Sequence, residues 1–297
     1  MRSEQEMLYL ILDIARNDER VRAVIMNGSR TVTGSANGGD AFQDFDIIYV
    51  VNDMAWFRAN PGWIDCFGER MILQMPDDMG DQAPDPHDRY ACLMQFMDGN
   101  RIDLTIFPAD RRHELYDDSQ TIVLLDKDGM LEPFPPPSND SYLPNPPTAK
   151  QFSDCCNEFW WVCPYVAKGL WREQIFYAKR TLDKYLREEL DKMVVWYIGI
   201  ATDYKVSAGS EGKYIPKYLQ PELWELYQQT WSGADFDQTW NALLAMGELF
   251  RRCALDVAGH FGYEYPYQDD RRVSAHLLHV RALPKNANEI YGSIVRS

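Results

Sequence analysis

The sequence has 297 residues, of which 45% are hydrophobic and 25% charged, and a net charge of −15 at pH 7. This length allows one large or two ordinary domains, and the composition is typical of a folded protein and not of a disordered or fibrous one. The excess of acid argues against a nucleic-acid backbone as the main partner, because such binding depends on cationic patches.

Elements of both kinds are expected in the first part of the chain. Residues 4–17 place apolar side chains at helical spacing, while residues 21–27 and 45–51 are apolar, β-branched runs typical of strands. A hairpin is expected where residues 90–97 and 101–108 flank Asp98-Gly99-Asn100, because Asp-Gly tolerates the positive φ of tight turns. Short helices are also expected at 54–60, 63–68 and 110–117, and further strands at 69–75 and 121–126.

Residues 132–147 contain seven of the 17 prolines in the chain. Such a segment favours extended, semi-rigid geometry. We therefore predict a first domain at 1–131, a linker at 132–147 and a second domain at 148–297.

The second domain is expected to be helical. Thr148 can cap its first helix, which Pro164 should kink or break because proline removes a backbone hydrogen bond. Further helices are expected at 171–190, 192–204, 221–229, 236–261 and 269–283.

The cysteines and the N-terminal residues indicate in which cellular compartment the protein is expected. No C-x-x-C pair is present among the six cysteines, and Cys155, Cys156 and Cys163 lie near no histidine, so we interpret them as reduced thiols. The first twenty residues carry charges throughout, and no apolar run of about 18 residues could span a membrane. A cytoplasmic protein without a membrane partner is therefore expected.

Gly28, Ser29 and Arg30 follow the first expected strand directly. A Gly-Ser pair can turn the chain and open a helix, whose first N–H groups are unsatisfied donors. Those groups, the Ser29 hydroxyl and the Arg30 guanidinium suit the oxygens of a phosphate.

Two aspartates, Asp44 and Asp46, stand at the start of the second strand. Because side chains alternate along a strand, both point to the side opposite Phe45 and Ile47. Adjacent carboxylates repel unless a cation lies between them, which favours a hard divalent ion such as Mg²⁺. Asp103, on the polar side of its own strand, can join them if the strands are neighbours.

This order, Gly-Ser, then Asp-x-Asp, then a single Asp on a later strand, resembles the nucleotidyltransferase superfamily that includes polymerase β. A closer resemblance, through nearly the whole chain, is to the aminoglycoside 6-adenylyltransferases, also known as streptomycin adenylyltransferases. It is carried by MRSEQEM, by GSR followed by FQDFDI, by DGNRIDLTIFP, by LLDKDG and by the helix DCCNEFW…YVAKGL. It implies an α/β (α+β) nucleotidyltransferase domain with a mixed central sheet, followed by an all-helical, substrate-binding C-terminal domain.

The resemblance also implies a reaction, the transfer of AMP from Mg-ATP to the 6-hydroxyl of streptomycin, which releases pyrophosphate and gives antibiotic resistance. The triphosphate would lie across Gly28, Ser29 and Arg30, with one or two Mg²⁺ ions held by Asp44 and Asp46. Asp103 would hold metal or accept the hydroxyl proton; the alternative is a structural salt bridge with Arg101. Streptomycin is polycationic, which suits an acidic protein, although many bacterial enzymes are acidic for solubility alone.

The acceptor contacts are expected in the helical domain. By resemblance, a lysine after the linker reaches the nucleotide phosphates, and Lys168 is the candidate; the alternative is a solvated helix lysine. Acids there can pair with guanidinium or ammonium groups, and tryptophans can stack on a sugar or a guanidinium. The candidate acids are Asp154, Glu158 and Glu173, and the candidate tryptophans are Trp160, Trp161 and Trp171. Because adjacent residues cannot share a helix face, at most one of Trp160 and Trp161 should be core.

Two other hypotheses remain at this stage. The same chemistry could act on another aminoglycoside, a different small molecule or a protein side chain. Alternatively, the chain could be a nucleotide-binding module without catalysis, although three converging acids destabilise a fold that does not use them. Either a monomer or a homodimer is compatible with the sequence.

Overall fold

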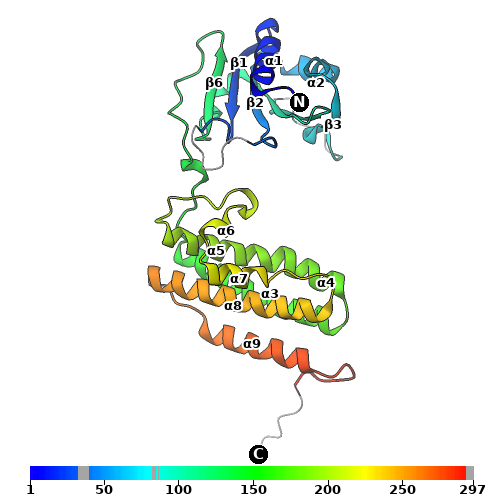
Figure 1. Cartoon of the computed structure of the whole chain (residues 1–297), viewed down its shortest axis with the longest axis vertical. Coiled ribbons are helices and arrows are strands. Elements are labelled where there is room, and N and C mark those ends of the chain that lie inside the picture. The colour runs from blue at the N-terminus through cyan, green and yellow to red at the C-terminus, as the bar shows by residue number, and fades with distance from the viewer. Residues whose placement is uncertain (33–39, 82–84, 86, 292–297) are drawn as a thin grey trace, which may run out of the picture. The chain divides into compact units, whose positions relative to one another are not determined.

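The computed structural model describes residues 1–32, 40–81, 85 and 87–291. The chain divides into two compact units, Met1–Tyr142 and Leu143–Ser297 (Figure 1). The division lies inside the proline-rich segment for which the sequence predicts a linker. Each unit has its own hydrophobic core and is described separately below.

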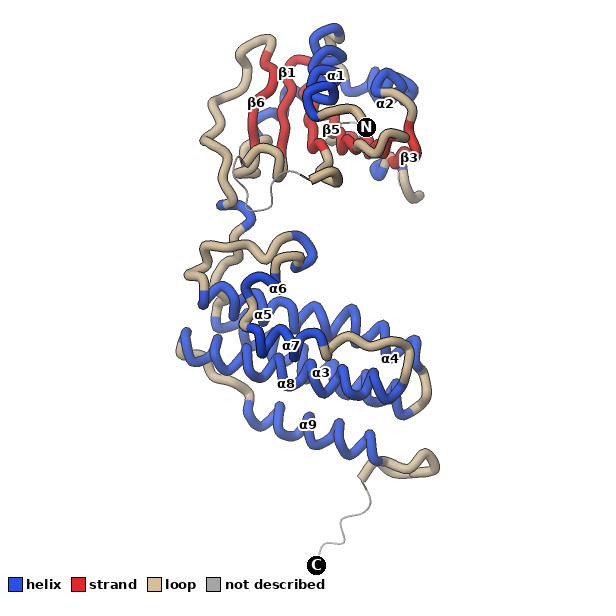
Figure 2. Tube along the Cα trace, viewed as in Figure 1, coloured by secondary structure: helices blue, strands red, loops and turns tan. Residues whose placement is uncertain are grey.

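A six-stranded mixed sheet forms the centre of the first unit (Figure 2). Its strand order is β3-β4-β5-β2-β1-β6. β2 and β5 are parallel, and every other neighbouring pair is antiparallel. The strands are β1 (Val21–Asn27), β2 (Phe45–Val51), β3 (Arg70–Gln74), β4 (Tyr90–Phe96), β5 (Arg101–Pro108) and β6 (Thr121–Asp126).

The two faces of this sheet differ. Helix α1 (Glu4–Asn17) and helix α2 (Met54–Ala59) pack with the larger core on one face, where Met7 and Ile11 meet Ile47 and Tyr49. Among the described residues, the opposite face carries a smaller cluster, formed by Ala23, Ile25, Val50, Phe107 and Leu115. This division follows from the alternation of side chains along each strand, and it leaves room for polar residues on the second face.

Turns and short helices connect the strands. In the predicted hairpin between β4 and β5, Gly99 has a φ of 89° and the Phe96 N–H donates to the Asn100 carbonyl at 2.9 Å. Two of the expected short helices are 3₁₀ turns, η1 (Pro61–Phe67) and η3 (Ala109–Glu114). The other 3₁₀ turns of this unit are η2 (Pro76–Asp78) and η4 (Asp140–Tyr142).

The second unit contains helices and no strand within its described part. Its main core is formed by α3 (Ala149–Trp171), α5 (Arg187–Ala201) and α8 (Phe236–Phe261). The shorter elements are α4 (Ile175–Arg180), the π-helical turn η5 (Thr181–Leu186), the 3₁₀ turn η6 (Ser210–Gly212), α6 (Ile215–Tyr218), α7 (Pro221–Gln228) and α9 (Tyr267–Ala282).

Two expectations for these helices were wrong. α3 continues through Pro164 to Trp171, because buried side chains on both sides of the proline, including Val162 and Val166, hold the helix in the core. The chain turns at residues 172–174 and is then helical from Ile175 to Ala201, without the expected break near residue 191. The π-helical turn η5 adds one residue to the helical turn between α4 and α5. Leu182, Leu186 and Leu190 all remain buried along this continuous helix.

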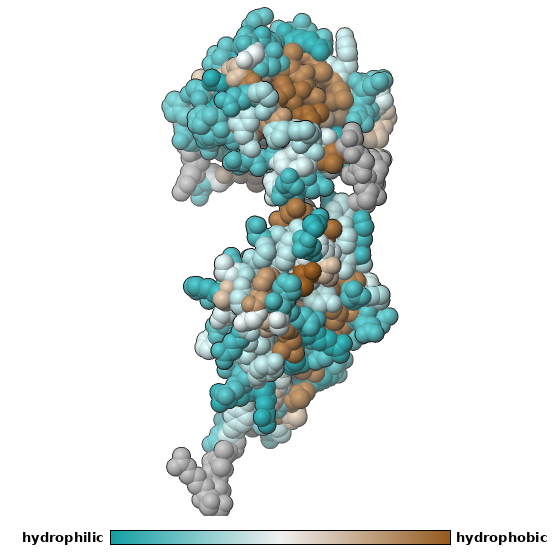
Figure 3. All heavy atoms as spheres, turned by 90° about the vertical axis from the view of Figure 1, so that its left-hand side faces the viewer, coloured by the Kyte–Doolittle hydropathy of each residue, from teal (hydrophilic) through white to brown (hydrophobic). Residues whose placement is uncertain are grey.

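Hydrophilic side chains cover most of the surface seen in Figure 3, as a charged fraction of 25% predicts. A patch of apolar side chains is visible on the first unit, on the side where β6 forms the sheet edge. Among the residues described, none of the helices combines the length and the apolar character needed to cross a membrane.

Candidate active site

The register of the sheet places three polar residues in one row. Asp46 of β2 is paired with Asp103 of the parallel neighbour β5, and with Asn27 of β1 on its other side. Paired residues on adjacent strands point to the same face of a sheet. The polar face of the first unit therefore carries Asn27, Asp46 and Asp103 side by side.

Asp44 completes a group of three carboxylates. It lies two residues before Asp46 and so points to the same side of the chain. One carboxylate oxygen each from Asp44, Asp46 and Asp103 lies within 4.8 Å of the others, and all three residues are half-buried. The structure thus brings together the three aspartates that the sequence singles out.

Repulsion within this group is visible at Asp46. Its pKa is raised from 3.8 to about 6, first by burial and then by the negative charges of Asp44 and Asp103. The charge of Arg101 opposes this rise. A carboxyl group in such surroundings is stabilised in its ionised form by any cation that binds next to it.

Arg101 supplies one such cation from within the chain. Its guanidinium donates to both oxygens of Asp103, each at 2.7 Å, and lies 3.8 Å from the Asp44 carboxylate. The salt bridge considered as the alternative role of Asp103 is therefore present. The Arg101 side chain is 45% exposed, so it can turn outward to solvent when another cation occupies the group.

These residues fit a divalent metal ion. All three are oxygen donors, which hard ions such as Mg²⁺ prefer, and they converge from neighbouring positions of one sheet. Arg101 already balances part of their charge, which indicates that the group requires a positive partner. We therefore regard Asp44, Asp46 and Asp103 as the candidate ligands.

Gly28 lies directly against this group. It follows β1 with a φ of +80°, and a Cβ atom built on it would lie 2.2 Å from Oδ2 of Asp46. The chain then turns, as Thr31 donates to the Gly28 carbonyl from its N–H and from its hydroxyl. No helix opens between Ser29 and β2 within the described residues, so the expected helix N-terminus is corrected to a turn, and residues 33–39 lie outside the description.

Arg30 is placed differently from the phosphate-facing position expected for it. Its guanidinium donates to the carbonyls of Gln43 and Asp44, at 2.6 and 2.8 Å, and lies 4.0 Å from the centre of the Phe45 ring. Its side chain is only 10% exposed. Arg30 thus fastens the segment that leads into β2 and helps to place Asp44, while the Ser29 hydroxyl accepts from the Gln43 amide at 3.0 Å.

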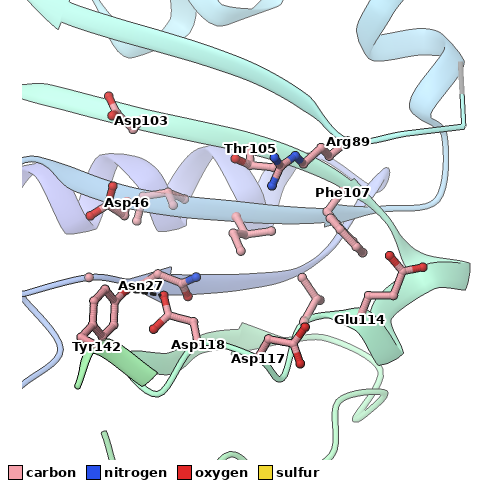
Figure 4. A pocket seen from close by; sticks show the side chains of 14 residues that line it. Asn27, Asp46, Arg89, Asp103, Thr105, Phe107, Glu114, Asp117, Asp118 and Tyr142 are labelled. Atoms are coloured by element: carbon pink, nitrogen blue, oxygen red, sulfur yellow. Dashed lines mark hydrogen bonds between the residues drawn. The ribbon is translucent and has the colours of Figure 1, made fainter. Parts of the chain in front are cut away.

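A pocket of about 490 Å³ opens over this face of the first unit (Figure 4). Asp46, Asp103, Asn27 and Tyr142 lie toward one end of the view, and Phe107 and Glu114 toward the other. The polar lining residues that sequence reasoning missed are Asn27, Arg89, Thr105, Glu114, Asp117, Asp118 and Tyr142. Thr105 could have been found, since it alternates in phase with Asp103, whereas Arg89 and Asp118 come from connecting segments that only the fold brings here.

In the second unit, several candidates share one helix face. Asp154, Glu158, Trp161, Tyr165 and Lys168 follow each other along α3 at spacings of three or four residues and are all exposed. We call these five residues the outer face of α3. The Trp161 and Tyr165 rings lie edge to face at 6.2 Å, and the Lys168 ammonium lies 4.8 Å from the Tyr165 ring. Asp154 is paired with Lys150 at 2.6 Å.

The two adjacent tryptophans separate as expected, but the assignment of Trp160 is corrected. Trp160 is 2% exposed and packs edge to face against Phe159 and Phe250, so it has no surface to offer an acceptor. Trp161, by contrast, is 63% exposed. The burial follows from helical spacing, because Trp160 continues the apolar stripe of α3 and Trp161 does not.

The remaining two candidates lie at the C-terminal end of α3. Glu173 has a φ of 58°, is exposed, and lies 3.4 Å from the Lys285 ammonium. Trp171 is partly buried, and its indole N–H donates to the Leu283 carbonyl at 3.1 Å. Glu173 is therefore exposed but already pairs with one cation of the chain, whereas Trp171 anchors the segment after α9.

Comparison with known proteins agrees with the resemblance seen in the sequence. A family model described as streptomycin adenylyltransferase matches residues 1–280. The aminoglycoside 6-adenylyltransferases of Bacillus subtilis (strain 168) and Campylobacter jejuni are each 38% identical over 272 residues, which is 91% of this chain and 95% and 93% of theirs. That of Staphylococcus aureus is 34% identical over 268 residues, 90% of this chain and 94% of its own. A crystal structure of an aminoglycoside 6-adenyltransferase from Bacillus subtilis matches with 34% identity and a TM-score of 0.47, covering 95% of this chain and 100% of that one. This chain belongs to the streptomycin adenylyltransferase family.

Proposed function

We propose that this protein transfers the adenylyl group of ATP to the 6-hydroxyl of streptomycin, with Mg²⁺ as cofactor and pyrophosphate as the second product. The observation that carries the proposal is the convergence of Asp44, Asp46 and Asp103 beside the Gly28 turn, in a member of this family. The names of the relatives support an aminoglycoside as the acceptor.

The turn after β1 is suited to the phosphates of the nucleotide. In the described part of the chain, the backbone N–H groups of Ser29 and Arg30 donate to no acceptor. Gly28 allows the backbone to approach the carboxylates without a side chain in between. Phosphate oxygens bound at this turn would therefore lie next to the metal ligands.

In the proposed reaction, the acceptor hydroxyl oxygen forms a bond to the α-phosphorus while the bond from that phosphorus to the bridging oxygen of pyrophosphate breaks. Asp44 and Asp46 would hold the ion. Asp103 either completes the ligand set, with the hydroxyl proton passing to water, or accepts that proton itself. Each Asp103 oxygen retains lone pairs beyond the one that accepts from Arg101. When bound, a divalent ion supplies positive charge against the phosphate oxygens and the charge that develops on them.

For the acceptor, we propose acids of the helical unit as partners. Asp154 and Glu158 on the outer face of α3, and Glu173 just beyond it, are exposed carboxylates that suit guanidinium groups. Trp161, on the same face, offers a ring on which a guanidinium can stack. Lys168, farther along this face, is our candidate for a contact to a nucleotide phosphate.

The test is pyrophosphate release from Mg-ATP with streptomycin, with a panel of other aminoglycosides and with no acceptor. Asp46→Asn removes a proposed ligand, and Asp81→Asn is the matched control, because Asp81 is exposed and does not line the pocket. Release that requires streptomycin, persists in the control and falls by about 10² or more in Asp46→Asn supports the proposal. Release with another aminoglycoside alone would reassign the acceptor, and release with no member of the panel would refute it.

The two roles of Asp103 give different results in Asp103→Asn. If Asp103 is a ligand, the Mg²⁺ concentration needed for half-maximal activity rises. If it is the base, that concentration is unchanged while the turnover rate falls by about 10² to 10⁴.

A further inference from the structure

Arg89 is a cation in the pocket for which the reaction outlined above has no role. It directly precedes β4 and lines the pocket together with Asp46 and Asp103. Figure 4 shows its side chain beside that of Thr105. Thr105 is two residues beyond Asp103 on the same face of β5, a distance of about 7 Å along a strand.

Within the described part of the chain, the guanidinium of Arg89 makes no hydrogen bond and no salt bridge, although its charge acts on the adjacent Asp88. Among the described residues that line the pocket it is the only cation, and five carboxylic acids line the same space. Glu114, one of these acids, already accepts from both Nε and Nη2 of Arg111, at 2.7 and 2.6 Å. Arg89 is therefore exposed and, among the described residues, free of salt bridges, whereas the nearby Asp88 and Glu114 are paired with Arg111.

The backbone that carries Arg89 is held firmly by two other arginines. Arg58 donates to the carbonyls of Asp85, Asp88 and Arg89, at 2.9 to 3.2 Å. Arg111 donates to the carbonyl of His87 and to the Asp88 carboxylate, both at 3.1 Å. These contacts fix the start of β4, so the Arg89 side chain projects from a defined position and not from a loose loop.

The charge of Arg89 identifies the kind of ligand that it can meet. A polycationic acceptor would be repelled by it, whereas a phosphate offers the oxygens that a planar guanidinium binds in bidentate fashion. A polyphosphate that begins at the carboxylate group can extend over the 7 Å or so to Thr105. Thr105 would add a hydroxyl donor at the same place, since its side chain points to the same face.

We propose that Arg89 binds the phosphoanhydride part of the nucleotide, which becomes the leaving pyrophosphate. This assignment rests on the proposed function, because it takes ATP as the anionic substrate. Arg89 is thus a binding residue for the donor, with no direct role in recognising the acceptor.

Titration of the full-length protein with inorganic pyrophosphate in the presence of Mg²⁺, followed by calorimetry, tests this proposal without turnover. Arg89→Gln should weaken pyrophosphate binding about 10- to 100-fold, as expected for the loss of a charge-assisted contact, and Arg89→Lys should recover part of it. Arg16→Gln is the matched control, because Arg16 is an exposed arginine of the last turn of α1, on the other side of the sheet. Streptomycin binding and the melting temperature should be unchanged in all three variants.

Three results would overturn the assignment. The first is that wild type and Arg89→Gln bind pyrophosphate with equal affinity. The second is that Arg16→Gln loses as much affinity as Arg89→Gln, which would indicate an effect of net charge. The third is that the wild type does not bind pyrophosphate. If Arg89→Gln does not fold, the Arg89→Lys titration decides the matter alone, since wild-type affinity with a single-point donor would also contradict bidentate binding. Failure of the proposed function is distinguishable, because it would show as absent adenylyl transfer in the wild type while the pyrophosphate titration still reports on Arg89.

Discussion

Gly28 and Asp46 approach so closely that any side chain on the glycine would collide with the carboxylate. A Cβ atom would lie 2.2 Å from Oδ2 and 3.2 Å from Cγ of Asp46. The backbone turn and the metal-ligand candidate therefore occupy adjoining space, and a change at one must move the other.

Gly28→Ala is expected to lower the adenylyl-transfer rate by about 10² and to weaken Mg²⁺ binding, because Asp46 must rotate away from its neighbours. Stability should fall by about 1 to 2 kcal/mol from the positive φ alone. Gly129→Ala is the control, since Gly129 also has a positive φ, of 62°, but no atom lies within 4 Å of its Cβ position. If both variants lose stability and only Gly28→Ala loses activity, the collision is responsible; equal activity in both would contradict this account.

The raised pKa of Asp46 predicts that this candidate metal ligand lowers the stability of the metal-free fold at neutral pH. Above pH 6 the folded protein holds an ionised carboxylate whose pKa is about 6, against 3.8 in the unfolded chain, so ionisation opposes folding there. This penalty disappears as the pH falls from 6 toward 4, because the folded protein then takes up the proton.

Without metal, Asp46→Asn should therefore melt at a higher temperature than wild type at pH 8, and the difference should shrink toward zero near pH 4. Differential scanning calorimetry in EDTA measures this. Added Mg²⁺ should stabilise the wild type more than the variant, because it binds the folded state with its full ligand set. A variant that is less stable than wild type at pH 8 in EDTA would refute the predicted repulsion.

Arg101 should compete with the metal in the nucleotide-free protein. Arg101→Gln removes a cation that contacts Asp103 and lies 3.8 Å from Asp44, so Mg²⁺ affinity should rise severalfold. The pKa of Asp46 should rise further in the metal-free variant, since Arg101 lowers it.

Isothermal titration with Mg²⁺ and a carbon-13 NMR titration of the aspartate carboxyls measure these two effects. Arg22→Gln is a suitable control, as Arg22 pairs with Asp128 and does not line the pocket. Weaker Mg²⁺ binding in Arg101→Gln than in the control would mean that Arg101 supports the ligand geometry instead of competing with the ion.

The adjacent tryptophans of α3 should respond in opposite ways. Trp160→Ala leaves a large cavity beside Phe159 and Phe250 and should cost about 3 to 5 kcal/mol of stability. Trp161→Ala should leave stability nearly unchanged and raise the KM for streptomycin, with little effect on the KM for ATP. Chemical denaturation and steady-state kinetics compare the two; an unchanged streptomycin KM in Trp161→Ala would remove the outer face of α3 as the acceptor surface.

Much of the chain could be predicted by local pattern. The spacing of apolar residues predicted α1, α8 and the paired strands, and alternation placed Asp44 and Asp46 opposite Phe45 and Ile47. Of the kink or break predicted at Pro164, the break does not occur, because buried packing outweighs the loss of one hydrogen bond, an effect that a local rule does not include. Helical spacing places Trp160 on the apolar stripe of α3, but it does not identify Phe250, 90 positions away in α8, as the ring that packs against it.

By itself, the sequence determined the family, the alternation of helix and strand, and the identity of the three aspartates, because these depend on residue type and short-range spacing. The tertiary structure alone decided that β2 and β5 are neighbours in register, that Arg101 also lies near Asp44, and that Arg89 lies in the pocket without a hydrogen bond or salt bridge to another described residue. These outcomes depend on pairings between segments tens of residues apart. Such pairings are selected by the packing of the whole unit, and no local pattern in the chain encodes them.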